Sequence, residues 1–135
     1  MSDLILSTFT GAGLLDRGFR KAGYCVVCTG DPIFGQEGLE TFHAPSGIFH
    51  GVIGGPPWQL WAKSQNLAGN KKKHPNLIPE FERIVSEACP EWFLMENVSG
   101  APLPKIENYE VQSKMIFAYE LGSSQRRPRR FSFGS

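Results

Sequence analysis

Short apolar strands alternate with helices or loops along this chain, and this alternation limits the folds that it can adopt. Leu4-Ile5-Leu6 opens a strand, and Leu14 to Ala22 has helical spacing that ends at Gly23. The same patterns predict strands at Cys25 to Cys28, Gly51 to Gly54 and Trp92 to Met95, and helices at Gln36 to Phe42 and Leu77 to Ala88. Strands that alternate with helices over short connections predict an open, mostly parallel α/β sheet.

The remaining segments are expected to be loops and a final strand pair. A Pro-rich loop at Ala101 to Lys105 is followed by two strands, Val111 to Leu121 and Arg130 to Phe133. Gly55 to Asn76 is a long loop rich in Gly, Pro, Asn and Lys, and loops of this length in compact domains are more often functional or disordered than incidental. The 135 residues are expected to form one domain, residues 1–135, without internal repeats.

Composition excludes several classes of protein. The net charge is +1, so no overall field directs the chain to nucleic acid or membrane. No stretch approaches the roughly 18 apolar residues that a bilayer span needs, and no signal peptide is visible. We therefore expect a cytoplasmic protein without a membrane partner. The basic residues are nevertheless clustered, as Lys71-Lys72-Lys73 and as Arg126, Arg127, Arg129 and Arg130.

The cysteines do not indicate a disulfide framework or a metal site. Their number is odd, at three, which suits a reducing compartment. Cys25 and Cys28 have C-x-x-C spacing, but no second pair completes a zinc site. Both lie in the apolar run Tyr24 to Thr29, which we expect to be a buried strand in which they pack into the core. We therefore expect no metal.

Four polar or glycine-rich segments follow predicted strands. They are Phe9 to Gly13, Gly30-Asp31, Gly55 to Gln59 and Glu96-Asn97. Ligands of open α/β sheets bind beyond the carboxyl ends of the strands, near the point where strand order reverses. In isolation, Phe9 to Gly13 fits a ligand-binding turn or a simple tight turn, and Asp31 fits a ribose contact or an Asp-Pro turn. Together they predict one site at this edge.

With these segments in this order, the chain resembles the DNA cytosine-5 methyltransferases, in particular compact phage-type members. Phe9-x-Gly11-x-Gly13 is similar to the family's S-adenosylmethionine loop, and Gly55-Pro56-Pro57-x-Gln59 to its catalytic loop. Glu96-Asn97-Val98 is similar to the acid motif, and Gln125-Arg126-Arg127-Pro128-Arg129 to the Gln-x-Arg-x-Arg motif. The resemblance implies a Rossmann-like S-adenosylmethionine-dependent methyltransferase fold acting on double-stranded DNA.

The resemblance also assigns roles. Phe9, Gly11, Gly13 and Pro56 would line S-adenosylmethionine, with Asp31 on its ribose. Glu96 would bind the ring nitrogen and amino group of a flipped-out cytosine, which makes C6 a better electrophile. Arg127 and Arg129 would hold the target's phosphate and base edge. The DNA contacts would come from Gln59, Lys71, Lys72, Lys73 and Gln125, with the lysine loop closing over the duplex.

Several positions depart from the family pattern. Trp58 stands where the family has its cysteine nucleophile, Ser7 where it usually has aspartate, and Leu14 where it usually has glycine. Residues 43–50 form a short segment without a clear counterpart for the aspartate that contacts the cofactor's adenine. The target-recognition domain and the family's final helix have no counterpart, so we expect that a second chain could supply target recognition.

Three functions follow from these observations. Because an indole cannot add to a pyrimidine ring as a thiolate does, the first is a methyltransferase-family protein impaired in C5 chemistry. The second is a non-catalytic module that binds DNA or a partner. The third is an exocyclic amino (N4 or N6) methyltransferase, in which an aromatic residue follows Pro-Pro and stacks on the base. Those enzymes place Asp, Asn or Ser where this chain has Gly55.

Overall fold

The computed structural model describes residues 3–9, 14–29, 42–56, 77–117 and 128–135 of the chain. The elements in these ranges are β1 (Leu4–Thr8), α1 (Leu14–Lys21), β2 (Cys25–Thr29), β3 (Gly51–Gly54), α3 (Ile78–Ala88), β4 (Trp92–Val98), β5 (Val111–Phe117) and β6 (Pro128–Gly134). Most of the helix predicted at Gln36 to Phe42, and most of the long loop from Gly55, lie outside the described residues. The other predicted elements are present, with shifted ends.

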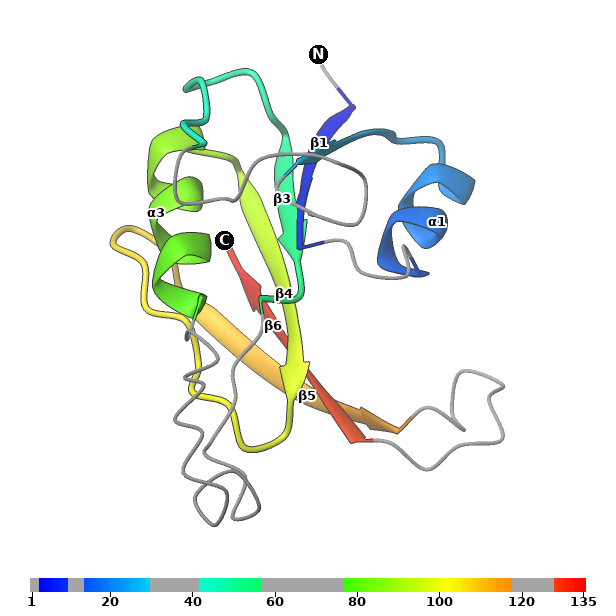
Figure 1. Cartoon of the computed structure of the whole chain (residues 1–135), viewed down its shortest axis with the longest axis vertical. Helices are drawn as coiled ribbons and strands as arrows, with labels where there is room; N and C mark the ends of the chain where they lie inside the picture. Colours follow the sequence, from blue (N-terminus) through cyan, green and yellow to red (C-terminus); the bar gives the residue numbers. More distant parts are fainter. Residues whose placement is uncertain (1–2, 10–13, 30–41, 57–76, 118–127) are drawn as a thin grey trace, which may run out of the picture.

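The strands form one six-stranded sheet in the order β2-β1-β3-β4-β6-β5 (Figure 1). The pairs β1–β2, β1–β3 and β3–β4 are parallel, whereas β6 runs antiparallel to both β4 and β5. The chain passes from β1 to β2 on one side and then to β3 on the other, so strand order reverses beside β1. The expected α/β class and mostly parallel sheet are therefore confirmed, and so is the closing strand pair.

Helix α3 covers one face of the sheet and encloses the main core. Its buried side chains are those of Ile78, Phe81, Ile84, Val85 and Ala88, spaced by three or four residues as an amphipathic helix requires. They pack with Leu6, Val52, Phe93 and Met95 from the strands below. The helix begins with a proline in its first turn and ends at Cys89, whose left-handed backbone (φ 48°) donates its N–H to the Val85 carbonyl.

Helix α1 lies on the opposite face, and here two expectations were wrong. Helical spacing predicted an apolar face that includes Gly18 and Ala22, but both residues are exposed, whereas the side chain of Asp16 is buried. Strand β2 is not a buried strand either, because it lies at the sheet edge with Cys25 and Val27 exposed. An edge strand has one neighbour only, so an apolar run does not ensure burial on both faces.

The α1 face of the sheet is covered unevenly. Phe19 of α1 stacks on Trp92 of β4, and Trp92 stacks in turn on Phe133 of β6. Beyond this stack, Leu94 and Phe131 are half-buried and Phe133 is 43% exposed. Within the described part of the chain, α3 therefore encloses one face of the sheet, and the α1 face is left open around Phe133.

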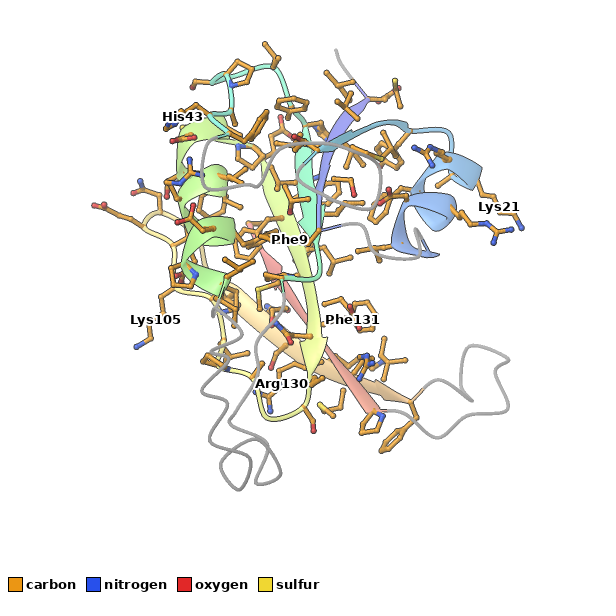
Figure 2. The ribbon with its side chains drawn as sticks, in the orientation of Figure 1. Phe9, Lys21, His43, Lys105, Arg130 and Phe131 are labelled. Carbon is orange, nitrogen blue, oxygen red and sulfur yellow. The ribbon has the colours of Figure 1, made fainter. Side chains whose placement is uncertain are left out.

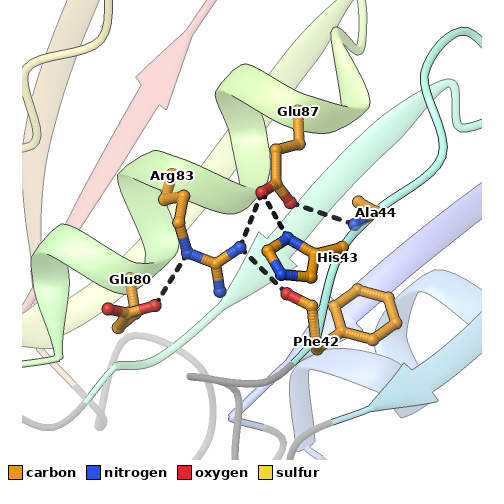
Figure 3. Close-up of polar contacts among 6 residues, drawn as sticks. All are labelled: Phe42, His43, Ala44, Glu80, Arg83 and Glu87. Carbon is orange, nitrogen blue, oxygen red and sulfur yellow. Dashed lines mark hydrogen bonds and ion pairs between the residues drawn. The ribbon is translucent and has the colours of Figure 1, made fainter.

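A network of charged side chains attaches residues 42–44 to α3 (Figure 3). Arg83 contacts the carboxylates of Glu80 and Glu87, each at 2.8 Å, and donates to the Phe42 carbonyl. Glu87 also accepts from the Ala44 N–H and contacts the His43 ring. Because residues 42–44 lead toward β3, this network fixes the approach of the chain to the central strands.

No helix in the described ranges is long and apolar enough to cross a membrane.

Candidate active site

The carboxyl ends of the parallel strands meet at one edge of the sheet. Thr8 of β1 pairs in register with Thr29 of β2 and Gly54 of β3, and Gly54 pairs with Met95 of β4. Phe9, Gly55 and Glu96 each follow one of these residues and therefore lie along the same edge. The first residues of three of the four predicted segments therefore lie along one edge, and Gly30-Asp31 lies outside the described residues.

Glu96 lies inside β4 rather than after it. The predicted strand ended at Met95, but β4 continues to Val98 because β6 pairs with it, with Glu96 opposite Phe131 and Val98 opposite Arg129. The antiparallel partner is distant in sequence and could not be inferred from the local pattern. This pairing gives Glu96 a fixed backbone on a central strand.

Glu96 and Arg129 form an ion pair on this extended part of the sheet. The Arg129 Nε atom lies 2.8 Å from Glu96 Oε1, and the two side chains are 27% and 31% exposed. A guanidinium N–H that donates to a carboxylate oxygen fixes the orientation of the carboxylate. Arg129 was predicted to hold the target; its ion pair is with the predicted catalytic acid, and its Nη1 also donates to the Pro128 carbonyl at 3.5 Å.

Gly55 makes room for the second oxygen of that carboxylate. A Cβ atom at position 55 would lie 2.8 Å from Glu96 Oε2, closer than carbon and oxygen atoms normally approach. A glycine at this position therefore lets the catalytic-loop backbone pass beside the acid. The sequence alone could not predict this steric reason for Gly55, because it depends on Glu96 from another strand.

Asn97 links the start of the Pro-Pro loop to β4 by a hydrogen bond. Its Nδ2 donates to the Pro56 carbonyl at 2.8 Å, and both residues are buried. Asn97 Oδ1 accepts the N–H of Val98, so the amide group is used at both ends. Asn97 was quoted only as part of a motif, and a buried amide directly after the acid is the signal that could have identified it.

Phe9 occupies an unusual backbone conformation at the end of β1. Its φ is 52°, in the left-handed region that a bulky residue rarely adopts, and such a residue costs on the order of 1 kcal/mol. Its ring is partly buried against the core. Figure 2 shows Phe9 beyond the end of β1 and Phe131 on the side of the sheet away from α3. The strained turn directs the chain away from β1 at the predicted cofactor edge.

The other predicted site residues lie outside the described residues. These are Trp58, Gln59, Gly11, Gly13, Asp31, Lys71, Lys72, Lys73, Gln125 and Arg127. The described part of the chain contains no group of three His, Cys, Asp or Glu residues that could hold a metal ion. The described site is therefore an acid, its arginine partner, and the anchored loop beside them.

Comparison with known proteins places the chain in a family. The profile of the C-5 cytosine-specific DNA methylases matches residues 36–135, which include the anchored loop, the acid and its arginine. The chain belongs to this family.

Curated relatives of this methylase-family chain are bacterial and archaeal Type II methyltransferases. M.FnuDI of Fusobacterium nucleatum is 28% identical over 158 residues, and M.NgoPII of Neisseria gonorrhoeae is 30% identical over 162 residues. M.MthTI of Methanothermobacter thermautotrophicus is 31% identical over 160 residues. Each alignment covers 96% of this chain but only 46%, 47% and 48% of the respective relative. The chain thus spans about half the length of these relatives.

Solved structures of methyltransferases share the fold of this methylase-family chain. A prophage-encoded E. coli protein described as a DNA modification methyltransferase has a TM-score of 0.68 at 24% sequence identity. The match covers 97% of this chain and 46% of the E. coli chain. The S. pombe Dnmt2 methyltransferase has a TM-score of 0.63 at 13% identity, covering 97% and 48% respectively. These likenesses confirm the expected methyltransferase fold.

Proposed function

We propose that this chain is the cofactor- and base-binding part of a DNA cytosine methyltransferase-type protein, and that Trp58 prevents C5 transfer by the chain as it stands. S-adenosylmethionine, when bound, supplies the methyl group. Its site would lie at the edge where strand order reverses, where the left-handed Phe9 turns the chain away from β1. Phe9 and Pro56 fit this position, and Gly11, Gly13 and Asp31 are proposed to complete it.

The observation that carries the proposal is the Glu96–Arg129 pair beside Gly55. One carboxylate oxygen is held by Arg129 at 2.8 Å and the other faces the loop of Pro56. A carboxylate oriented in this way can hydrogen-bond to the ring nitrogen and amino group of an extruded cytosine. Arg127, Gln59, Gln125 and Lys71 to Lys73 are proposed to hold the surrounding DNA.

The C5 reaction needs a group that this chain lacks at position 58. A thiolate adds to C6 of cytosine, the ring electrons move to C5, and C5 then attacks the methyl group; loss of the C5 proton expels the thiolate. The indole of tryptophan has no comparable nucleophilic atom. Among the described residues, Cys25 and Cys28 lie on the edge strand β2, and Cys89 lies at the opposite end of β4 from Glu96. None of these three thiols is placed to act as the nucleophile in place of a residue at position 58.

Substitution of Trp58 by Cys tests the proposal directly. With labelled S-adenosylmethionine and DNA, followed by digestion to nucleosides, the wild-type chain should give no 5-methylcytosine. Trp58→Cys should raise 5-methylcytosine by on the order of 100-fold or more over background, because it restores a covalent pathway. Trp58→Ser is the matched control, since it removes the indole without supplying a thiol. Formation of 5-methylcytosine by wild type would refute the proposed block.

The exocyclic amino reaction is less well supported. Such a site needs a side chain at position 55 to accept a hydrogen bond from the amine, and a Cβ atom there would meet Glu96 Oε2. Pro56-Pro57-Trp58 alone favours this function. Label on N4 of cytosine or N6 of adenine in the same digest would establish it.

A binding role without catalysis is the second candidate, and the open half of the α1 face favours it. In the described residues, Leu94, Phe131 and Phe133 are at least partly exposed on this face of the sheet. The curated relatives of the chain are about twice as long as the chain. We propose that target recognition comes from a polypeptide outside these 135 residues. Calorimetric titration with S-adenosylmethionine distinguishes a binding fold from an empty one: no binding by wild type or by Trp58→Cys would refute the proposed cofactor site.

A further inference from the structure

Asp16 is the one charged residue that is buried among the described residues, at 2% exposure. It lies in the first turn of α1, and the proposed function gives it no role. A carboxylate withdrawn from water is destabilising unless hydrogen bonds replace its hydration. The partners of Asp16 therefore indicate why the fold tolerates it.

The two oxygens of Asp16 accept hydrogen bonds from two different strands. Ser7 Oγ donates to Oδ1 at 2.5 Å, and Cys28 Sγ donates to Oδ2 at 3.1 Å. Ser7 and Cys28 are themselves paired in register across β1 and β2. Burial, followed by the hydrogen bond and the charge of Asp16, raises the pKa of Cys28, so this thiol stays protonated and remains a donor. Arg20 donates to the same sulfur at 3.4 Å.

This arrangement joins the three elements around the predicted cofactor edge. Ser7 precedes Phe9 by two residues, Asp16 follows the start of α1, and Cys28 is next to the last residue of β2. A single carboxylate therefore sets the position of α1 relative to the ends of both strands. Thr8, the next residue of β1, instead donates to the Ile53 carbonyl and has no part in the arrangement.

We propose that Asp16 is a positioning residue for S-adenosylmethionine binding, acting through Ser7 and Cys28 to hold the β1–α1 and β2 ends at the spacing that the cofactor needs. The inference rests on the proposed cofactor site. It also explains how the chain accommodates serine at position 7, where the sequence departs from the family. The hydroxyl and the carboxylate form a hydrogen-bonded pair between strand and helix, and the charge resides on the helix.

The test is calorimetric titration of S-adenosylmethionine into wild type, Ser7→Ala and Thr8→Val. Both substitutions remove one buried β1 hydroxyl bond, and only Ser7→Ala releases Asp16. Ser7→Ala should weaken binding about tenfold, the effect of losing one hydrogen bond to a charged group, whereas Thr8→Val should change Kd less than about twofold. The exchange variant Ser7→Asp/Asp16→Ser should recover most of the affinity, because it restores the pair in reverse.

Urea unfolding of the same proteins separates positioning from stability. The role of Asp16 would be overturned if Ser7→Ala and Thr8→Val weakened S-adenosylmethionine binding equally, or if a folded exchange variant did not recover the affinity. Neither result would contradict the proposed cofactor site. Absence of binding by wild type would overturn both proposals. Ser7→Ala removes one hydrogen bond of Asp16 without removing its carboxylate, so the comparison remains decisive even when Asp16→Ala does not fold.

Discussion

Gly54 and Gly55, two adjacent glycines at the end of β3, should respond differently to the addition of a side chain. A Cβ at Gly54 would lie 2.6 Å from the Thr8 backbone carbonyl, which cannot move without breaking the β1–β3 pairing. A Cβ at Gly55 would instead meet the far end of the Glu96 side chain, which can rotate. The first glycine is thus required by the fold, and the second by the position of the acid.

We expect Gly54→Ala to lower the free energy of unfolding by roughly 3 kcal/mol, and Gly55→Ala by less than about 1 kcal/mol. Gly55→Ala should nevertheless weaken binding of a duplex with a cytosine opposite an abasic site by about tenfold, because Glu96 is displaced. Urea unfolding and fluorescence anisotropy measure the two effects. Unchanged DNA affinity of Gly55→Ala would show that the position of Glu96 does not affect base binding.

At this scale, motif positions led to a proposal for the acid, but the contacts around it could not be predicted. Glu96, Arg129 and Pro56 could be named because motif positions are local in sequence. The buried Asp16 was missed, since it interrupts an otherwise apolar helix face and its donors, Ser7 and Cys28, come from other elements. Burial of a polar group depends on contacts between elements, and these are not visible in a single segment.

At the scale of the elements, α3 holds its neighbours by charge as well as by apolar packing. Burial alone would raise the pKa of Glu87, but the contacts from His43, the Ala44 N–H and Arg83 outweigh it and lower this pKa. The pKa of Arg83 is raised in turn, since the hydrogen bonds that it donates to Glu80 and Glu87 outweigh its burial. The side chain of Glu87 is 27% exposed, so solvent screens the network only in part.

Glu87→Gln should reduce the free energy of unfolding by about 1 kcal/mol at pH 7. A carboxylate with a lowered folded pKa stabilises above its unfolded pKa, about 4.3, and this stabilisation is lost as pH falls through the folded value. The difference between wild type and Glu87→Gln in urea unfolding should therefore shrink as the pH is lowered from 7 toward 3. Glu91→Gln, at an exposed pair with His50, is the control with little effect. A difference that persisted undiminished at pH 3 would exclude an ionic origin.

The elements themselves were largely predictable, and their burial was not. The helices and strands followed from apolar spacing and from Gly and Pro, and their ends shifted by a few residues. The extension of β4 to Val98 and the exposure of β2 depend on where each strand lies in the sheet. Strand order is a property of the whole chain, and no local pattern encodes it.

For the whole molecule, the open part of the α1 face is the main surface that the described residues leave unexplained. Phe133→Glu should reduce binding of an apolar dye and concentration-dependent light scattering, because it places a charge among Leu94, Phe131 and Trp92. Val27→Glu is the matched control, since Val27 is 41% exposed, compared with 43% for Phe133, and lies on the edge strand. Equal effects of the two substitutions would show that this face has no special role.

The position of β6 in the sheet has a consequence for folding of the chain during its synthesis. It follows every other described strand in sequence, yet it lies between β4 and β5 and pairs with both. During synthesis, β4 and β5 emerge from the ribosome before the strand that joins them. Each therefore presents an unpaired edge to other nascent chains until residues 128–134 have been added. Protection of these two edges from aggregation therefore begins only when the strand that carries Arg129, the ion-pair partner of Glu96, is inserted between them.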